Sequence, residues 1–119
     1  MTKSQASGSN KDKIRFIRWE KSTPLTQEEA EANLHKEGYE SFCWYDVPGT
    51  EYPSHRHDYD ECLWILRGEV RLVIHDHTYE LNAGDKIYLP AKTTHSTKIP
   101  LTQGATYLVG QKAQRGLKT

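Results

Sequence analysis

Three side chains that can bind a metal lie close together in the middle of the chain. His55 and His57 are separated by one residue, and the carboxylate of Glu61 follows four residues later. In a β-strand, residues i and i+2 point to the same face, so both imidazoles can be presented to one point. Two imidazoles and a carboxylate that converge suit a divalent transition metal. The segment from 49 to 68 therefore predicts a metal site.

A fourth candidate ligand, His95, lies in a second segment that runs from 84 to 95. A predicted strand and a turn precede His95, and a hairpin-like stretch separates the two segments. Folding this hairpin back brings His95 near His55 and His57. Imidazole suits Zn, Cu, Fe and Ni, and an added oxygen ligand widens the choice to Mn. Four protein ligands on an octahedral ion leave two positions for water or substrate, as in a catalytic site.

The first segment resembles the first sequence motif of the cupin superfamily. That motif is a glycine, five residues, His-x-His, three or four residues, a glutamate, six residues and a glycine. The chain matches it without a gap, at Gly49, His55, His57, Glu61 and Gly68.

The second segment resembles the second cupin motif, with two departures. The chain matches the motif at Gly84, Pro90 and His95, while Lys92 replaces a glycine and Ile99 replaces an asparagine. Neither departure affects a proposed ligand. A residue other than glycine is costly where the backbone needs a positive φ, so we expect Lys92 to change the turn before His95. We expect the loss of asparagine at Ile99 to loosen the same turn.

The resemblance implies a ligand set and a fold. In cupins, the two histidines and the glutamate of the first motif and the histidine of the second bind a metal inside a small jelly-roll barrel. Carried over to this chain, the ligands are His55, His57, Glu61 and His95. The cofactor is then one divalent transition metal: Fe, Mn, Ni, Zn or Cu.

The resemblance does not imply a single reaction. Cupins include dioxygenases, decarboxylases, isomerases, lyases, sugar-binding proteins and regulatory sensor domains, and a fold alone does not decide function. By family frequency we expect a metal-dependent enzyme on a small organic molecule, with dioxygenase-like oxidation ahead of isomerase or lyase chemistry. Two alternatives stay open: a non-catalytic ligand-binding or sensor cupin, and a dimeric barrel that its metal only stabilises.

No further acid or base can be singled out, and Tyr88 and Tyr107 are the candidates for a catalytic role. On strand parity, Tyr59, Leu63 and Ile65 share a face with Glu61. We expect most of the other aromatic residues in the core or in a dimer interface.

A second His-x-His pair, His75 and His77, is not expected to bind metal. Asp76 and His77 occupy the place of a tight hairpin turn, and no carboxylate follows at a matching distance.

The residues that position the site form short strands. Runs rich in β-branched and aromatic residues alternate with turn chemistry from residue 41 onward, which predicts an all-β sandwich or barrel. The resemblance narrows this to a cupin jelly-roll β-barrel. The predicted strands are SFCWYDV, CLWIL, VRLVIH, TYELN, KIYLP and ATYLVG.

Two elements are expected ahead of this barrel. The run from 14 to 19 alternates weakly and predicts an edge strand. Thr26 and Glu29 form a capping-box pattern, and Gly38 is a C-terminal stop signal. We therefore predict one short helix from Gln27 to Lys36.

The length of 119 residues fits one domain. We expect a disordered tail over 1–13, a single cupin domain over 14–112 and a frayed C-terminus over 113–119. The 16 Lys+Arg balance 16 Asp+Glu, which argues against a nucleic-acid partner. The absence of a signal peptide or a long apolar run predicts a cytoplasmic protein with no membrane partner. The barrel edges predict a homodimer in which the 14–19 strand joins a partner's sheet.

Overall fold

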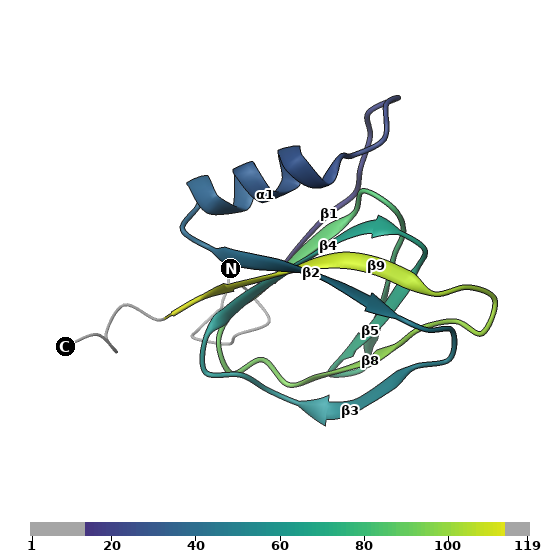
Figure 1. The fold of residues 1–119 in the computed structure, drawn as a ribbon. Coiled ribbons are helices and arrows are strands. Elements are labelled where there is room, and N and C mark those ends of the chain that lie inside the picture. The colour runs from purple at the N-terminus through teal and green to yellow at the C-terminus, as the bar shows by residue number, and fades with distance from the viewer. Residues whose placement is uncertain (1–13, 114–119) are drawn as a thin grey trace, which may run out of the picture.

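The computed structural model describes residues 14–113 (Figure 1). The predicted tail over 1–13, and all but the first residue of the predicted frayed end over 113–119, lie outside the described residues. Within residues 14–113 the chain forms nine strands and one helix. In chain order these are β1 (Arg15–Ile17), α1 (Gln27–Lys36), β2 (Glu40–Asp46), β3 (Glu51–His55), β4 (Asp60–Arg67), β5 (Val70–Ile74), β6 (His77–Leu81), β7 (Lys86–Leu89), β8 (His95–Lys98) and β9 (Ala105–Lys112).

The strands form two antiparallel sheets. One has the order β1-β7-β4-β9-β2, and the other has the order β3-β8-β5-β6. The sheets face each other and enclose one apolar core, which includes Leu63, Ile65, Leu72, Ile87 and Ile99. This arrangement confirms the predicted all-β fold with one short helix, and it is that of a jelly-roll barrel.

The helix α1 has the predicted bounds and the predicted cap. The Thr26 side chain accepts a hydrogen bond from the backbone of Glu29, and the Glu29 side chain accepts one from the backbone of Thr26. The helix buries Ala30 and Leu34. These two pack in a second cluster with Cys62 and other residues on the outer face of the five-stranded sheet. The helix therefore covers the barrel from outside (Figure 1).

The segment ahead of the helix is tied to the barrel through a buried carboxylate. Asp85 accepts hydrogen bonds from the backbone of Trp19 and of Asn82, and it forms an ion pair with Arg18 at 2.9 Å. The strand β1 pairs with β7 at the edge of its sheet, as predicted. The N-terminal strand is thus held at the barrel wall.

Two strands of the four-stranded sheet, β3 and β8, are missing from the runs predicted by composition, although the spacing of His55 and His57 assumed a strand there. β3 contains Pro53 and opens with a glutamate, while β8 reads HSTK, so neither has the apolar and β-branched run that marks a strand. They pair with each other, with a register shift between Tyr52 and His55. The structure also places the hairpin turn one residue earlier than predicted, at His75 and Asp76.

None of the described residues belongs to a helix long and apolar enough to cross a membrane.

Candidate metal centre

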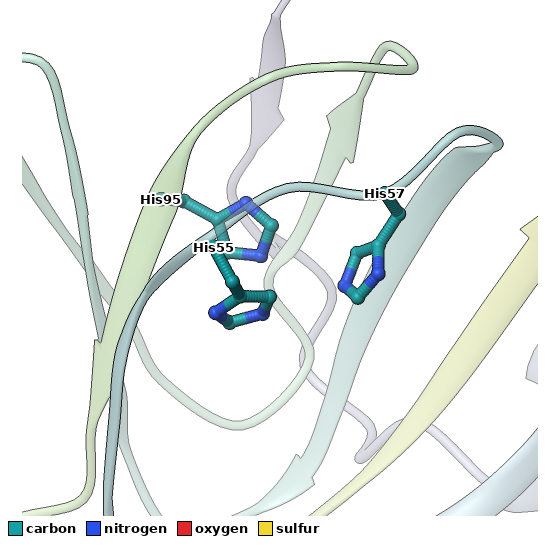
Figure 2. A group of neighbouring side chains, drawn as sticks. All are labelled: His55, His57 and His95. Atoms are coloured by element: carbon teal, nitrogen blue, oxygen red, sulfur yellow. The ribbon is translucent and has the colours of Figure 1, made fainter.

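Three histidine side chains converge between the two sheets (Figure 2). The ring centroid of His55 lies 4.9 Å from that of His57 and 4.5 Å from that of His95. One ligand nitrogen from each ring lies within 4.8 Å of the others. Nitrogen atoms at this separation can bind one ion together.

The backbone explains why the rings meet. His55 ends β3 and lies directly opposite His95, the first residue of β8. His57 was expected on the same strand, but β3 ends at His55 and His57 lies in the following loop (Figure 2). The loop is held in place because the backbone N–H of Lys92 donates to the carbonyl of His57 at 2.6 Å. The two sequence motifs are therefore joined by a direct hydrogen bond.

Backbone carbonyls orient two of the three rings. The Nδ1 of His55 lies 2.7 Å from the carbonyl oxygen of Pro53, and the Nδ1 of His95 lies 2.9 Å from that of Thr93. A carbonyl only accepts, so each Nδ1 must carry the proton, and each Nε2 keeps a lone pair. Burial and the neighbouring imidazoles lower the pKa of His95. Neutral rings with a free Nε2 are the form that binds metal.

Glu61 lies beside two of these histidines. Its Oε1 is 3.6 Å from the Nε2 of His95 and 3.8 Å from the Nε2 of His57. This oxygen is buried and has no hydrogen-bond partner. Burial raises the pKa of the Glu61 carboxyl to about 7. A buried oxygen without a donor is costly, and a cation would satisfy it, so the residues present fit a divalent metal.

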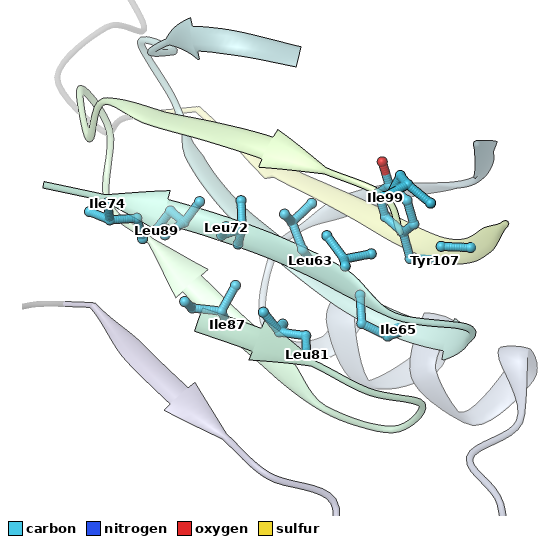
Figure 3. Close-up of a cluster of buried hydrophobic side chains, with 11 residues drawn as sticks. Leu63, Ile65, Leu72, Ile74, Leu81, Ile87, Leu89, Ile99 and Tyr107 are labelled. Atoms are coloured by element: carbon cyan, nitrogen blue, oxygen red, sulfur yellow. The ribbon is translucent and has the colours of Figure 1, made fainter. Parts of the chain in front are cut away.

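A cavity of about 240 Å³ extends from the histidines between the sheets. Aromatic and apolar side chains make up most of its wall. The lining residues other than the four proposed ligands are Phe42, Trp44, Tyr52, Tyr59, Leu63, Thr97, Tyr107, Val109 and Gln111. Figure 3 shows Leu63 and Tyr107 among the buried core side chains.

The structure separates the two tyrosines that were candidates for catalysis. Tyr107 lines the cavity. Tyr88 does not, because it pairs with Cys62 across β4 and β7 and so lies on the opposite face from Glu61. There its hydroxyl donates to Glu37 at 2.7 Å, in the cluster under the helix. Tyr88 is therefore corrected to a packing residue of the outer face.

Two of the three residues predicted from strand parity line the cavity. Tyr59 and Leu63 do so with Glu61, and the ring of Tyr59 stacks on that of His57 with centroids 4.8 Å apart. Ile65 is buried in the core between the sheets with Leu63 but does not line the cavity. His77 lies outside the histidine cluster and its ring contacts Tyr79 instead.

Sequence reasoning missed a buried carboxylate, Asp46, at the other end of the cavity wall. It accepts hydrogen bonds from Trp44 and Tyr52 through Oδ1, and from Tyr107 through Oδ2. A signal was present, since Asp46 is the next-to-last residue of a predicted strand and alternates with Trp44. The pairing of β2 with β9, which brings Tyr107 to it, is not visible in the local sequence.

The structure shows the backbone at both departures in the second motif. Lys92 adopts φ of 68°, the left-handed conformation that favours glycine and is costly for a residue with a Cβ. Ile99 is fully buried in the core. Its N–H donates to the carbonyl of Thr50, and its own carbonyl accepts from Gly49, so backbone bonds hold this end.

Comparisons with known proteins agree with this fold. The family model described as "Cupin domain" matches residues 44–109, which is more than half of the chain. A search of the curated proteins finds no match.

Three solved structures illustrate the likeness. A cupin 2 domain-containing protein from Halorhodospira halophila is 17% identical, with a TM-score of 0.64 over 85% of this chain and 76% of that one. A cupin protein from Bacteroides fragilis is 21% identical, with a TM-score of 0.58 over 85% and 89%. The polyketide cyclase RemF from Streptomyces resistomycificus is 23% identical, with a TM-score of 0.58 over 64% and 55%. At these identities the likeness shows the fold alone. With the family model and the two-sheet barrel in agreement, the chain belongs to the cupin family.

Proposed function

We propose that this protein is a metal-dependent enzyme that transforms a small organic molecule in the cavity beside the histidines. His55, His57 and His95 would hold one divalent transition ion with Glu61. The observation that supports this most directly is the buried Oε1 of Glu61, which has no donor and lies beside two Nε2 atoms. Without a cation this buried oxygen would be an unsatisfied group, which is costly.

The protein's own residues would orient the reactants. The carbonyls of Pro53 and Thr93 fix two imidazoles with Nε2 facing the site. The apolar side chains of the wall, such as Leu63 and Val109, offer contacts to an apolar part of the substrate. When bound, the ion supplies Lewis acidity toward an oxygen of the substrate, or a site for O2. Glu61 in its ionised form would balance part of that charge.

The reaction class stays a proposal. Dioxygenase-like oxidation is ranked first by family frequency. Isomerase or lyase chemistry comes next, and similar structures that include a polyketide cyclase and DMSP lyases give it support. Both classes use the same ligand set, so the residues of the site do not separate them.

The experiment that tests this function begins with metal content. The purified protein is reconstituted with Fe, Mn, Ni, Zn and Cu in turn and analysed for bound metal after gel filtration. We expect one ion per chain in the wild type, a large loss in His95→Ala, and full uptake in the control His77→Ala. If no transition metal is bound before or after reconstitution, the proposal is wrong.

Turnover then separates an enzyme from a binding protein. The loaded protein is incubated with a panel of small aromatic and hydroxylated acids, with and without O2, and followed by NMR. Products that form only with O2 would indicate oxidation, and products in both conditions would indicate isomerase or lyase chemistry. Tight binding without any product would favour the sensor alternative. A metal that raises stability without ligand binding would favour the structural alternative.

The proposal includes a homodimer. β1 and β2 are the edges of the five-stranded sheet, and large apolar side chains are exposed on or beside them.

A further inference from the structure

The cavity has two polar ends with an apolar middle. At one end are the three histidines and Glu61. At the other, Tyr52 and Tyr107 line the wall, and their hydroxyls donate to the buried Asp46. The register of β4 with β9 places Leu63 and Val109 between Glu61 and Tyr107. Between the two ends the wall is formed by apolar side chains that include Leu63 and Val109.

Asp46 determines which way the hydrogen bonds at its end point. It is only 5% exposed, and it accepts from three donors: the indole of Trp44 at 2.9 Å, the hydroxyl of Tyr52 at 2.5 Å and that of Tyr107 at 2.6 Å. An indole N–H can only donate, and a carboxylate that receives these bonds is well satisfied. Each hydroxyl proton is therefore committed to Asp46.

The committed protons leave lone pairs on the tyrosine oxygens. Burial and the hydrogen bond to Asp46 raise the pKa of Tyr107, so the phenol keeps its proton at neutral pH. The Tyr52 oxygen also receives the indole N–H of Trp44, at 3.3 Å. Among the described residues no hydrogen bond to the Tyr107 oxygen is seen, so its lone pairs can accept one. A ligand group that meets it must donate a hydrogen bond.

The charges around the cavity restrict the kinds of ligand that it can bind. Among the described residues that line it there is no Lys or Arg. Glu61 lies at one end and Asp46 behind the other, so the bound metal would be the single positive charge available to an anion. A second anionic group on the ligand would lie next to Asp46 without a partner, which is unfavourable in a buried site.

We propose that the cavity selects a small, mainly apolar molecule with one oxygen group for the metal and a hydroxyl at the opposite end that donates to Tyr107. Asp46 is a positioning residue in this proposal, since it acts through Tyr107 and does not touch the ligand. The inference rests on the proposed metal site for one end of the ligand. Sites that hydrogen-bond a substrate hydroxyl discriminate strongly against the analogue that lacks it.

Calorimetric titration of the Zn²⁺-loaded protein tests this directly. The probes are two pairs of different length, benzoate with 4-hydroxybenzoate and phenylacetate with 4-hydroxyphenylacetate, together with terephthalate as a dianion. We expect the hydroxylated member of at least one pair to bind at least tenfold more tightly than its parent. Terephthalate is expected to bind more weakly than benzoate.

Variants connect that preference to the residues named. Tyr107→Phe should reduce the hydroxylated-to-parent ratio to about one, and Asp46→Asn should reduce it through the altered orientation of Tyr107. The control Tyr79→Phe, on β6 and outside the lining, should keep the wild-type ratio. Thermal melting shows which variants fold. If Asp46→Asn does not fold, the binding ratio of Tyr107→Phe is enough to test the proposal.

The proposal is overturned if neither pair shows the preference, if none of the five probes binds, or if the preference survives in Tyr107→Phe. Metal uptake is measured separately by elemental analysis. If the protein takes up no ion, the proposed function fails, and the hydroxyl preference is still determined by titrating the metal-free protein with the same pairs.

Discussion

Glu61 makes the stability of the metal-free protein depend on pH. Burial raises its pKa to about 7 from an ordinary 4.5, so the folded state holds this proton more tightly than the unfolded state. Its contribution is therefore greatest below pH 4.5 and is lost as the pH rises toward 7, by roughly 2–3 kcal/mol. Glu61→Gln has no such titration. We expect Glu61→Gln to gain stability relative to wild type between pH 5 and 7.5, measured by urea unfolding in chelator.

The buried histidines change the stability with pH in the direction opposite to Glu61. For this reason the measured quantity is the difference in unfolding free energy between Glu61→Gln and wild type. Burial lowers the pKa of His57 and His95, so protonation of these rings as the pH falls below about 6.5 favours the unfolded state. His57 and His95 titrate in the wild type and in Glu61→Gln alike. Their contributions therefore largely cancel in the difference between the two unfolding free energies. An unchanged difference in unfolding free energy between pH 5 and 7.5 would contradict the assignment.

Lys92 holds a backbone conformation that suits glycine. Its φ of 68° costs a residue with a Cβ on the order of 1 kcal/mol, and its N–H holds the loop of His57. Lys92→Gly relieves this strain at some cost in unfolded-chain entropy. We expect a gain of up to about 1 kcal/mol in the free energy of unfolding, measured by urea denaturation.

Lys92→Ala is the matched control, because it removes the charge and keeps the Cβ. We expect it to remain within about 0.5 kcal/mol of wild type. If Lys92→Gly is no more stable than Lys92→Ala, the strain is not the dominant effect at this turn.

At the level of elements, the cap of α1 can be tested independently of the site. Thr26 accepts from the backbone of Glu29 and starts the helix that covers Cys62 on the outer face. Thr26→Ala leaves that N–H without its partner, so we expect a loss of about 1 kcal/mol in unfolding free energy. Thr26→Ser keeps the oxygen and should lose much less. Equal losses in the two variants would show that the capping bond contributes little.

The local sequence predicted the elements that have their own strong signals. The capping box located α1 at both ends, and apolar runs located the five-stranded sheet and the hairpin of β5 and β6. The composition of the sequence did not predict β3 and β8. Pro53 in β3 and the polar run HSTK in β8 lack the apolar and β-branched residues that indicate a strand. Their pairing depends on the rest of the barrel, which no short window of sequence contains.

The candidate site, like the fold, was predictable only where a local sequence motif exists. The spacing of His55, His57 and His95 reflects a local motif, and these rings do meet. The Asp46 network was not predictable, because it joins β2 to a strand sixty-one residues later. Packing decides the register between distant strands. The contact of Asp46 with Tyr107 at the far end of the cavity could therefore be seen only in the structure.

At the scale of the whole molecule, the site links the two sheets. His55 and His95 lie on the four-stranded sheet, whereas Glu61 lies on the five-stranded one. A bound ion would therefore join the two halves of the barrel at this end. The cavity opens beside Phe42 and Trp44, which line it and are also close to half exposed. The entrance thus lies along β2, an edge strand of the five-stranded sheet.

The edge strands of the five-stranded sheet, β1 and β2, lead to the last prediction, that the protein is a homodimer. Edge strands leave backbone groups unpaired, and such edges are commonly covered by a second copy. Ile17 on β1 is 39% exposed, and Val47, directly after β2, is 59% exposed. We expect sedimentation velocity at micromolar concentration to give a dimer. Ile17→Lys and Val47→Lys place a charge at each edge in turn, and the variant that dissociates identifies the interface.

Val73→Lys serves as the control, because this side chain is 40% exposed and lies on β5, an inner strand of the four-stranded sheet. It should sediment as the wild type does. A wild-type protein that sediments only as a monomer would refute the dimer. A dimer that survives both edge variants would place the interface elsewhere on the barrel. If the β2 edge is the interface, Val47→Lys should also expose the cavity entrance, since Phe42 and Trp44 lie on the same strand.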